Sequence, residues 1–562
     1  MKVFPFFFFL LPLVCPGKVR LPAIFSDNLV FQQRSGNPIW GWADSKEKVT
    51  VKTSWGGTHS ATAGKDGKWM VIAHTPKASR GHQVTIQGSN KIVLKNIAIG
   101  EVWLCAGQSN MGWSTQNSFE AEKETEVDLP DYRIYRSARE HWHEPLKENR
   151  DRLARWKPCD PKSAAETSAV AYYFGKKLHQ TLGVPVGIIQ RAYAGTPIEG
   201  WMPWSIQRDD PRAQAHKRTY EEASKRLVAR GVSREKALAA YEKELAEYNA
   251  KIGRGETMKN KVRPLTPPII TKPPDLGHQY PAHIYNAMIA PIRPYAIRGL
   301  IWYQGERNAK NAAQAEHYYH QLRIMIDHYR SSWHGESWGA VSDGFPVYFT
   351  QLPSWNPPQD KPVEGPESPW VVSRESMRKL SLDLHQTGMA VTIDTGDAIG
   401  LHPKNKKPIG LRHAYLALGK TYGLPIVHEG PVLYENSIEG KKLVLRFTSS
   451  GSGLMAARKG KLDSFAIAGK DRIWHWAVAK IVQDSVVLSS PKVNNPVAAR
   501  YAWAMNPSKR NLLYNKEGFP ASPFRTDDWP LYDPKADSID VIKPEKPDGY
   551  KAKDWSRPKI SE

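Results

Sequence analysis

Short apolar runs separated by turn signals fill residues 21–99. Residues 49–51 and 82–86 alternate apolar and polar side chains, as half-buried strands do, and no helical period competes with them. Gly56-Gly57 is one of several turn signals between such runs. The pattern predicts a small β-sandwich over residues 18–98, whose expected role is packing rather than chemistry.

The pattern becomes mixed after residue 99. Apolar residues recur at helical spacing over residues 164–182, and a compact strand is expected at residues 184–189. Residues 209–252 are charged and alanine-rich with helical spacing, and a proline-rich stretch follows them. We expect an α/β domain over residues 99–425, with a helical hairpin inserted at about residues 205–275 that serves as a lid or only as a solvated excursion.

Strand patterns return in the last quarter of the chain. Residues 431–434, 442–447 and 485–489 alternate as strands, with glycines between them. They predict a C-terminal β-domain over residues 426–529. Residues 530–562 are rich in proline, lysine and aspartate with few apolar residues, so a poorly ordered tail is expected there.

The first residues resemble a secretory signal. Lys2 supplies a positive start and residues 3–15 an apolar core, so we expect residues 1–17 to be removed and the protein to be secreted or periplasmic. The alternative is an uncleaved anchor. No later segment offers about 20 consecutive apolar residues, so no stable membrane insertion is expected after cleavage. Cys105 and Cys159 would remain, enough for at most one disulfide.

Composition adds one observation, the charge. The 79 basic residues exceed the 56 acidic ones and give a net charge of +23. Lysine and arginine are spread along the whole chain, without a dominant basic run or a zinc-finger spacing, so nucleic acid is not an expected partner. We interpret the excess as surface charge that favours acidic glycans.

Candidate chemistry lies where predicted strands end. The apolar run 102–106 stops at Gly107 and Ser109 follows, at the place where open α/β sheets bind their ligands. A serine there is either a nucleophile or the cap of the next helix. The motif is not the Gly-x-Ser-x-Gly elbow, because Met111 occupies the last position.

Three more predicted strands end in polar loops. These loops carry Gly195, the segment from Gln304 to Asn308, and His402. A glycine past a strand lets a substrate oxygen approach its backbone N–H, and an amide side chain can donate to an oxyanion. A lone histidine is usually structural. Four polar loops at four strand ends make catalysis the simpler interpretation.

Four blocks identify a family resemblance: Gly107-Gln108-Ser109-Asn110-Met111, Ala194-Gly195-Thr196-Pro197, Trp302-Tyr303-Gln304-Gly305-Glu306-Arg307-Asn308 and His402-Pro403-Lys404-Asn405-Lys406. In this order they resemble the sialate O-acetylesterase family of SGNH hydrolases, and the match covers nearly the whole chain beyond the signal. The resemblance implies a three-layer, flavodoxin-like α/β catalytic domain with β-sandwich-like domains on both sides. It also implies hydrolysis of acetyl esters on sugars without a metal or other cofactor.

Roles carried over by this resemblance make Ser109 the nucleophile and His402 the general base. The Ser109 and Gly195 N–H groups and the Asn308 amide are the implied oxyanion hole. Substrate contacts are expected from three further side chains of the same blocks, namely Gln108, Gln304 and Arg307.

Three positions depart from the family pattern. Ala194 stands where the first of two glycines is usual, Arg307 replaces a serine, and Ile399 occupies the place of the aspartate three residues before the histidine. The acid that serves His402 is therefore open: Asp397 is favoured narrowly over Glu306, and Asp394 lies closer to the strand. A Ser-His dyad oriented by a backbone carbonyl is a further alternative.

The expected function is that of a secreted carbohydrate O-acetylesterase acting through an acetyl-serine intermediate. Its expected partner is an O-acetylated sugar or polysaccharide, including acidic glycans. One alternative is an acetylxylan or other polysaccharide deacetylase of the same fold. Another is a non-catalytic glycan-binding protein, an alternative that rests on Ala194 and Arg307.

Overall fold

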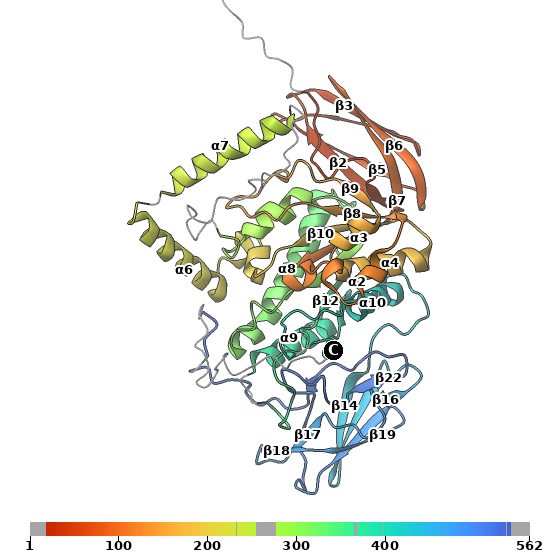
Figure 1. Cartoon of the computed structure of the whole chain (residues 1–562), viewed down its shortest axis with the longest axis vertical. Coiled ribbons are helices and arrows are strands. Elements are labelled where there is room, and N and C mark those ends of the chain that lie inside the picture. The colour runs from red at the N-terminus through yellow and green to blue at the C-terminus, as the bar shows by residue number, and fades with distance from the viewer. Residues whose placement is uncertain are drawn as a thin grey trace, which may run out of the picture.

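The computed structural model describes residues 18–231, 233–253, 277–364, 368–396, 398–535 and 537–540. The expected signal segment, the proline-rich end of the insertion, Asp397 and most of the expected tail lie outside these ranges. Figure 1 shows β-strands at both ends of the elongated molecule and a mixed α/β region between them.

A parallel sheet forms the middle of the molecule. Its strand order is β13-β12-β11-β7-β10-β8-β9, and every pair is parallel except β8 with β9. The strands are β7 (Lys91–Gly107), β8 (Leu129–Arg136), β9 (Trp156–Cys159), β10 (Val186–Ala192), β11 (Gly299–Tyr303), β12 (Val347–Thr350) and β13 (Thr387–Ala390). The strands expected at residues 102–106 and 184–189 are therefore present, with somewhat different bounds.

Helices cover both faces of this sheet. Val102, Leu104 and Ala106 of β7 pack in the same core cluster as residues of α8 (Ala312–Glu336) and α9 (Pro369–Asp383). Trp103 and Cys105 point to the other face, in the cluster shared with α4 (Ala169–Leu182) and α10 (Lys407–Leu416). A strand buried on both faces reads as a continuous apolar run, which is what residues 102–106 show.

The N-terminal strands join this sheet through β7. Its first half pairs with β6 and its second half with β10 and β11, so the boundary expected between residues 98 and 99 falls inside one continuous strand. The other N-terminal strands are β1 (Val30–Gln32), β2 (Gly36–Trp42), β3 (Lys48–Thr53), β4 (Thr58–Thr62), β5 (Lys68–His74) and β6 (Ser79–Gln87).

The helix expected at residues 164–182 is divided in two. α3 (Pro161–Glu166) ends before Thr167, and Ser168 caps α4 by accepting a hydrogen bond from the Ala171 N–H. Serine competes for backbone hydrogen bonds and is therefore favoured at a helix start rather than inside a helix. The remaining short helices are α1 (Ser109–Gly112), α2 (Ala121–Thr125), α5 (Trp204–Gln207) and the single turns Thr115–Asn117, Ile198–Trp201, Tyr285–Ile289, Ala290–Ile292 and Ala417–Thr421.

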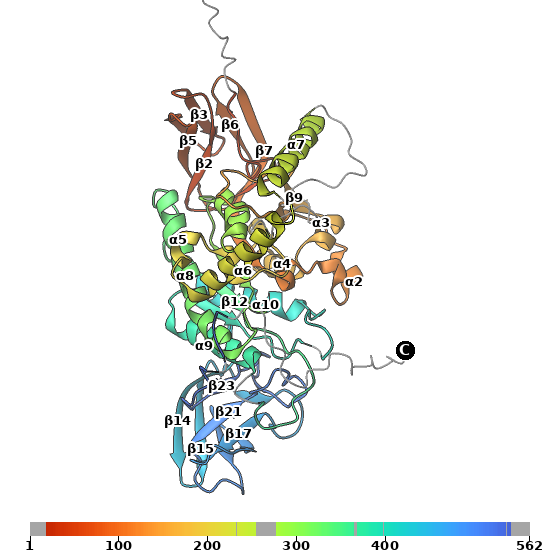
Figure 2. The same ribbon diagram turned by 90° about the vertical axis from the view of Figure 1, so that its left-hand side faces the viewer.

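The described part of the expected insertion is a pair of helices, α6 (Pro211–Val228) and α7 (Arg234–Gly253). Figures 1 and 2 show both helices projecting to one side of the sheet, with α7 reaching toward the N-terminal strands. Tyr241 of α7 is buried, and its hydroxyl accepts a hydrogen bond from Arg150 at 2.9 Å. The hairpin is thus anchored to the rest of the chain at this point.

The C-terminal strands pack around a second core, which also takes in Ile393, just after β13. They are β14 (Val432–Glu439), β15 (Lys442–Thr448), β16 (Leu454–Ala456), β17 (Phe465–Ala468), β18 (Trp474–Trp476), β19 (Val478–Val482), β20 (Ser485–Ser489), β21 (Ala498–Tyr501), β22 (Leu513–Asn515) and β23 (Phe524–Arg525). All of their pairings are antiparallel.

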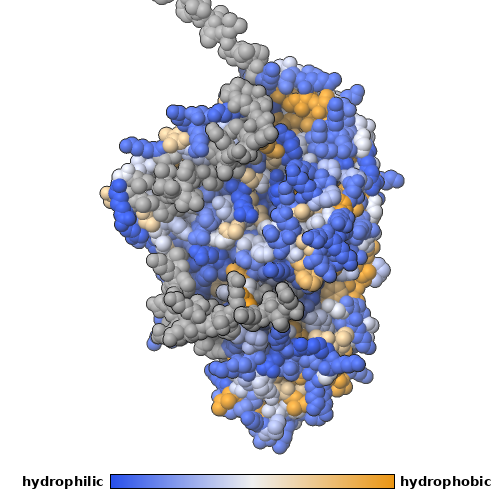
Figure 3. Space-filling view, in the orientation of Figure 1, coloured by the Kyte–Doolittle hydropathy of each residue, from blue (hydrophilic) through white to orange (hydrophobic). Residues whose placement is uncertain are grey.

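The face of the molecule seen in Figure 3 is mostly hydrophilic, with apolar residues in small patches. Within the described ranges, no helix combines the length and the apolar character needed to cross a bilayer. Cys105 and Cys159 are both buried and carry free thiols. The single disulfide that they could make is therefore not formed.

Candidate functional site

Three loops meet at the carboxyl end of β7. Gly107, its last residue, pairs with Ala192 at the end of β10 and with Tyr303 at the end of β11. Gly107 has a φ of 148°, and a Cβ built on it would lie 2.0 Å from the Tyr303 carbonyl oxygen. Only glycine fits there. The tight turn after Gly107 brings Ser109 beside the loops that follow β10 and β11.

Ser109 meets His402 at this edge of the sheet. The Ser109 Oγ lies 2.8 Å from the His402 Nε2, although the two residues are 293 positions apart. Ser109 is the first residue of α1, and His402 lies on the loop between β13 and α10. Both side chains are partly exposed. The predicted nucleophile and the predicted base are thus at hydrogen-bond distance and partly exposed.

The surroundings of His402 favour the neutral form of its imidazole. Burial lowers the pKa of His402, and the nearby Lys406 ammonium lowers it further. The Trp113 indole stacks on the imidazole, with ring centroids 5.2 Å apart and planes inclined by 19°. A neutral imidazole can accept the proton of a serine hydroxyl, which an imidazolium cannot.

Among the described residues, no side chain forms a hydrogen bond with the His402 Nδ1. Asp397 lies outside the described ranges. Asp394 accepts two hydrogen bonds from Arg412, at 2.7 and 2.6 Å, and one from Tyr514 at 2.7 Å. Glu306 accepts a hydrogen bond from Asn110 at 2.5 Å. Asp394 and Glu306 are therefore engaged with groups other than His402.

Two predicted oxyanion donors are backbone groups. Gly195 has a φ of 72°, in the region that favours glycine, and no described residue accepts a hydrogen bond from its N–H. Gln279 donates to the Gly195 carbonyl at 3.0 Å and so holds the turn. Ser109 begins a helix, where the first N–H groups have no intrahelical acceptor. Both N–H groups are available to a ligand.

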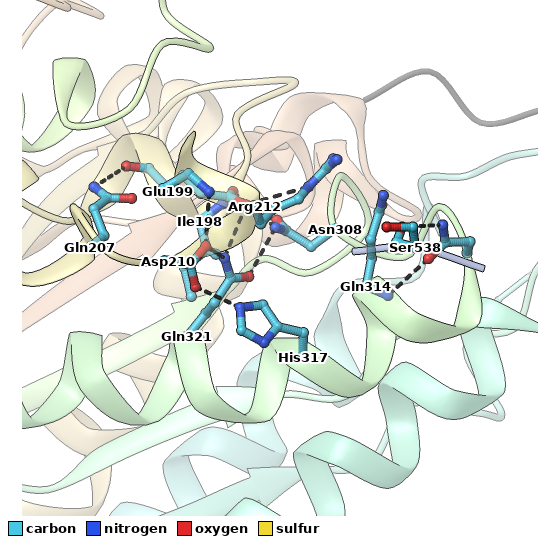
Figure 4. A network of polar contacts seen from close by, with 12 residues as sticks. Ile198, Glu199, Gln207, Asp210, Arg212, Asn308, Gln314, His317, Gln321 and Ser538 are labelled. Carbon is cyan, nitrogen blue, oxygen red and sulfur yellow. Dashed lines mark hydrogen bonds and ion pairs between the residues drawn. The ribbon is translucent and has the colours of Figure 1, made fainter. Parts of the chain in front are cut away.

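Asn308, the third predicted donor, belongs to a buried polar network (Figure 4). Its amide nitrogen donates to Glu199 at 3.0 Å and to Gln321 at 3.4 Å, and its oxygen accepts from the Ile198 N–H at 2.9 Å. Arg212 lies 3.5 Å from Glu199. Burial alone would raise the pKa of Glu199, but His216, the Arg212 guanidinium and the Asn308 amide hold that pKa below its usual range.

The three predicted substrate-binding side chains lie behind or beside the oxyanion loops. Gln108 and Gln304 are buried, and the Gln304 amide donates to the Gln108 oxygen at 3.3 Å and to the Asn308 oxygen at 2.8 Å. Arg307 is half-buried and donates to Gln279 at 3.1 Å. Through Gln279, Arg307 is linked to the Gly195 turn.

Ser109 and His402 open onto a cleft of about 840 Å³. Ala194 also lines it, and the opposite wall comes from β8, β9 and the segment between them. This wall carries four cations: Arg136, Arg139, Arg155 and Lys157. Arg136 is paired with Glu166 at 2.8 Å, whereas the other three form no ion pair with a described residue. The cleft therefore presents exposed positive charge to a ligand.

The described residues contain no cluster of three or more histidine, cysteine, aspartate or glutamate side chains arranged to hold a metal ion. The sequence interpretation also missed several residues of the site: Trp113, the cations of the cleft wall, and the buried Asn110 and Lys406. Asn110 and Lys406 stand within the blocks that carry the resemblance, but their contacts depend on packing between distant loops.

Comparison with known proteins finds relatives that match most of the chain. Residues 99–241 and 273–378 match the family model described as "Carbohydrate esterase, sialic acid-specific acetylesterase". The sialate O-acetylesterase of Rattus norvegicus is 25% identical over 538 residues, covering 89% of this chain and 93% of the relative. The corresponding human protein is 24% identical over 540 residues, covering 90% and 92%.

A solved structure resembles nearly the whole chain. The crystal structure of a carbohydrate acetylesterase from Xanthomonas citri is 30% identical and superposes with a TM-score of 0.73, covering 91% of this chain and 100% of the other. The shared architecture is a mixed α/β fold with a central sheet and additional β-sheets. The chain therefore belongs to the sialate O-acetylesterase family of carbohydrate esterases, which are carboxylic ester hydrolases.

Proposed function

We propose that the protein removes acetyl groups from sugars through an acetyl-Ser109 intermediate. The observation that carries this proposal is the 2.8 Å separation of the Ser109 Oγ and the His402 Nε2 on the rim of an open cleft. His402 takes the hydroxyl proton while the Ser109 oxygen attacks the acetyl carbonyl carbon.

The negative charge that develops on the carbonyl oxygen is held by the Ser109 and Gly195 N–H groups. Asn308 is the third donor in this proposal, through the amide hydrogen that meets Gln321 only at the long distance of 3.4 Å. Collapse of the tetrahedral species breaks the ester C–O bond, and His402 returns its proton to the leaving sugar hydroxyl. Water then attacks acetyl-Ser109 by the same route, releasing acetate and restoring the serine.

The acid of the triad is proposed to be Asp397, with Glu306 as the rival. Asp394 is the weaker alternative because its carboxylate is occupied by Arg412 and Tyr514. Gln108, Gln304 and Arg307 are proposed to support the oxyanion loops, and Arg307, which is half-buried, is also proposed to contact the substrate. These roles rest on the family resemblance and on the contacts described above.

The substrate is proposed to be an acidic glycan. Arg139, Arg155 and Lys157 are exposed, line the cleft that holds Ser109, and have no carboxylate partner among the described residues. Unpaired cations around a concave site raise the local concentration of anionic ligands. A neutral acetylated polysaccharide such as acetylxylan is the alternative substrate.

Export and the division into domains are part of the same proposal. The charged start and apolar core of residues 1–17 support a cleaved signal, which N-terminal sequencing of the mature protein would test. The core formed mainly by residues of the C-terminal strands supports a β-domain there, whereas β7 joins the N-terminal strands to the central sheet.

Acetate release by the Ser109→Ala variant tests the mechanism. We expect acetate release to fall on the order of 10³-fold or more, because the proposed nucleophile is removed. The thermal unfolding midpoint should not change, because Ser109 is small and partly exposed. Labelling of the wild-type protein by a fluorophosphonate, located on Ser109 by peptide mass, should be absent from the variant. Wild-type turnover in Ser109→Ala would refute the proposal and favour the non-catalytic alternative.

Substrate class is tested with the Arg139→Gln/Lys157→Gln variant. We expect KM for an O-acetylated sialoside to rise about 2- to 5-fold per removed charge, the range of an exposed ion pair worth up to about 1 kcal/mol. Activity on 4-nitrophenyl acetate, which is uncharged, serves as the control and should not change. If the wild type and the variant have equal KM values for the sialoside, and the wild type turns over acetylxylan faster than the sialoside, the substrate is a neutral polysaccharide.

A further inference from the structure

Three buried polar side chains lie directly behind the Ser109-His402 pair. They are Asn110, Glu306 and Lys406, with relative exposures of 0%, 3% and 0%. Each comes from a different strand-end loop: Asn110 follows Ser109 after β7, Glu306 lies after β11, and Lys406 precedes α10. None of them reaches the cleft, so none is placed to touch a substrate.

Asn110 connects the three loops. Its amide nitrogen donates to Glu306 at 2.5 Å and to the Leu401 carbonyl at 3.3 Å, and its oxygen accepts a hydrogen bond from the Lys406 ammonium. Leu401 immediately precedes His402. Asn110, which follows Ser109, therefore bonds to the residue that precedes His402. Its bond with Lys406 is a second link between the Ser109 helix and the His402 loop.

Burying these ionisable groups is expected to lower the stability of the fold. Burial raises the pKa of Glu306 and lowers the pKa of Lys406 to about 7, so each charge is disfavoured where it lies. The second carboxylate oxygen of Glu306 has no partner within the described residues. Apolar residues of similar volume often replace such buried ionic groups without loss of stability. A role in catalysis would explain why buried polar side chains occupy these positions instead of apolar ones.

We propose that Asn110 and Lys406 are positioning residues, which hold the His402 loop against the Ser109 helix and keep the His402 imidazole in its neutral, proton-accepting form. The inference rests on the proposed function, because it assigns these residues through His402. It adds no covalent step: the proton still moves between the Ser109 Oγ and the His402 Nε2.

The charged groups around His402 favour this assignment. Among the described residues, the titratable side chains that surround the network are His402 and Lys406 on one loop, and Tyr303, Glu306 and Lys310 at or beyond the end of β11. Lys406 is the charge that lowers the His402 pKa. Its ammonium also lies 5.3 Å from the Tyr303 ring centroid and 6.0 Å from that of Trp113.

The test is the pH dependence of kcat/KM for 4-nitrophenyl acetate. Lys406→Met keeps the side-chain length but removes the charge, so the His402 pKa should rise and the acid limb of the profile should move to higher pH. Lys407→Met is the matched control, because Lys407 is the next residue but lies exposed beside Glu124. Its acid limb should coincide with that of the wild type.

Two more variants guard against a folding defect. The Glu306→Gln/Lys406→Met double variant removes both buried charges, while the amide oxygen introduced at position 306 can still accept a hydrogen bond from Asn110. It should therefore fold and show the same displaced limb. Asn110→Ala should lower kcat about 10²-fold with little change in KM, the loss typical of misplaced catalytic groups. An unmoved acid limb in both Lys406 variants, or wild-type kcat in Asn110→Ala, would overturn the inference.

Ser109→Ala separates this failure from that of the proposed function. If Ser109→Ala is inactive while the Lys406 and Asn110 variants behave as wild type, only the positioning role is lost. If Ser109→Ala remains active, the proposed function itself fails, and the acid limb must report a group other than His402.

Discussion

The indole of Trp113 lies almost parallel to the imidazole of His402, with ring centroids 5.2 Å apart and planes inclined by 19°. Trp113 follows the four-residue helix that begins with Ser109, so the segment that carries Ser109 contacts His402 through this ring as well as through the 2.8 Å hydrogen bond. The stacked indole limits the rotation of the imidazole.

Replacing this ring should impair chemistry more than binding. We expect Trp113→Ala to lower kcat about 10-fold, because the imidazole gains rotational freedom and small errors of alignment are costly. Trp113→Phe, which keeps an aromatic face, should retain most of the activity. Steady-state kinetics on 4-nitrophenyl acetate checks both variants. Equal losses in the two would point to a packing defect rather than to the stacking contact.

Asn308 is the proposed oxyanion donor with the most protein contacts. Asn308→Ala should lower kcat by roughly 10²- to 10³-fold and change KM much less, because its amide bonds best to the charge of the transition state. The thermal unfolding midpoint must be measured alongside, since Glu199 and Ile198 lose a partner in this variant. A change in KM alone would make Asn308 a substrate-binding residue.

Two variants that replace a carboxylate with an amide test which acid orients His402. We predict that Asp397→Asn is more damaging than Glu306→Gln, since an amide favours the wrong imidazole tautomer, a change that costs about 10⁴ in a fully aspartate-dependent triad. The engagement of Glu306 by Asn110 agrees with this order. The kcat values on one acetyl ester suffice for the comparison.

The reverse order would transfer the role to Glu306. Modest losses in both variants would instead favour a dyad in which a backbone carbonyl orients the imidazole.

The pH dependence of activity follows from the His402 environment. Its pKa is depressed below the usual value of 6.5 by burial and by Lys406. A general base works when deprotonated, so activity is present above this pKa and is lost as the pH falls through it. We expect the acid limb of kcat/KM to lie below pH 6.5. A limb above that value would show that another group controls the reaction.

Much of the architecture follows from local sequence. The apolar run before Gly107 predicts β7 because a strand buried on both faces needs apolar residues at successive positions. Ser109 and His402 were both placed at strand ends, and the structure brings them together. Strand ends could be predicted because apolar period and turn residues are local properties. The roles proposed for these residues come from the family resemblance, because periodicity alone carries no information on function.

Long-range packing decided the rest. No local pattern shows that Asp394 pairs with Arg412, that the Asn308 amide meets Glu199, or that one strand joins the N-terminal sheet to the central one. The break at Ser168 was also missed, because the apolar spacing continues across it. A buried polar group must find a partner among the groups that the fold places beside it. Such partners come from distant segments, so only the tertiary structure decides which contacts surround Ser109 and His402.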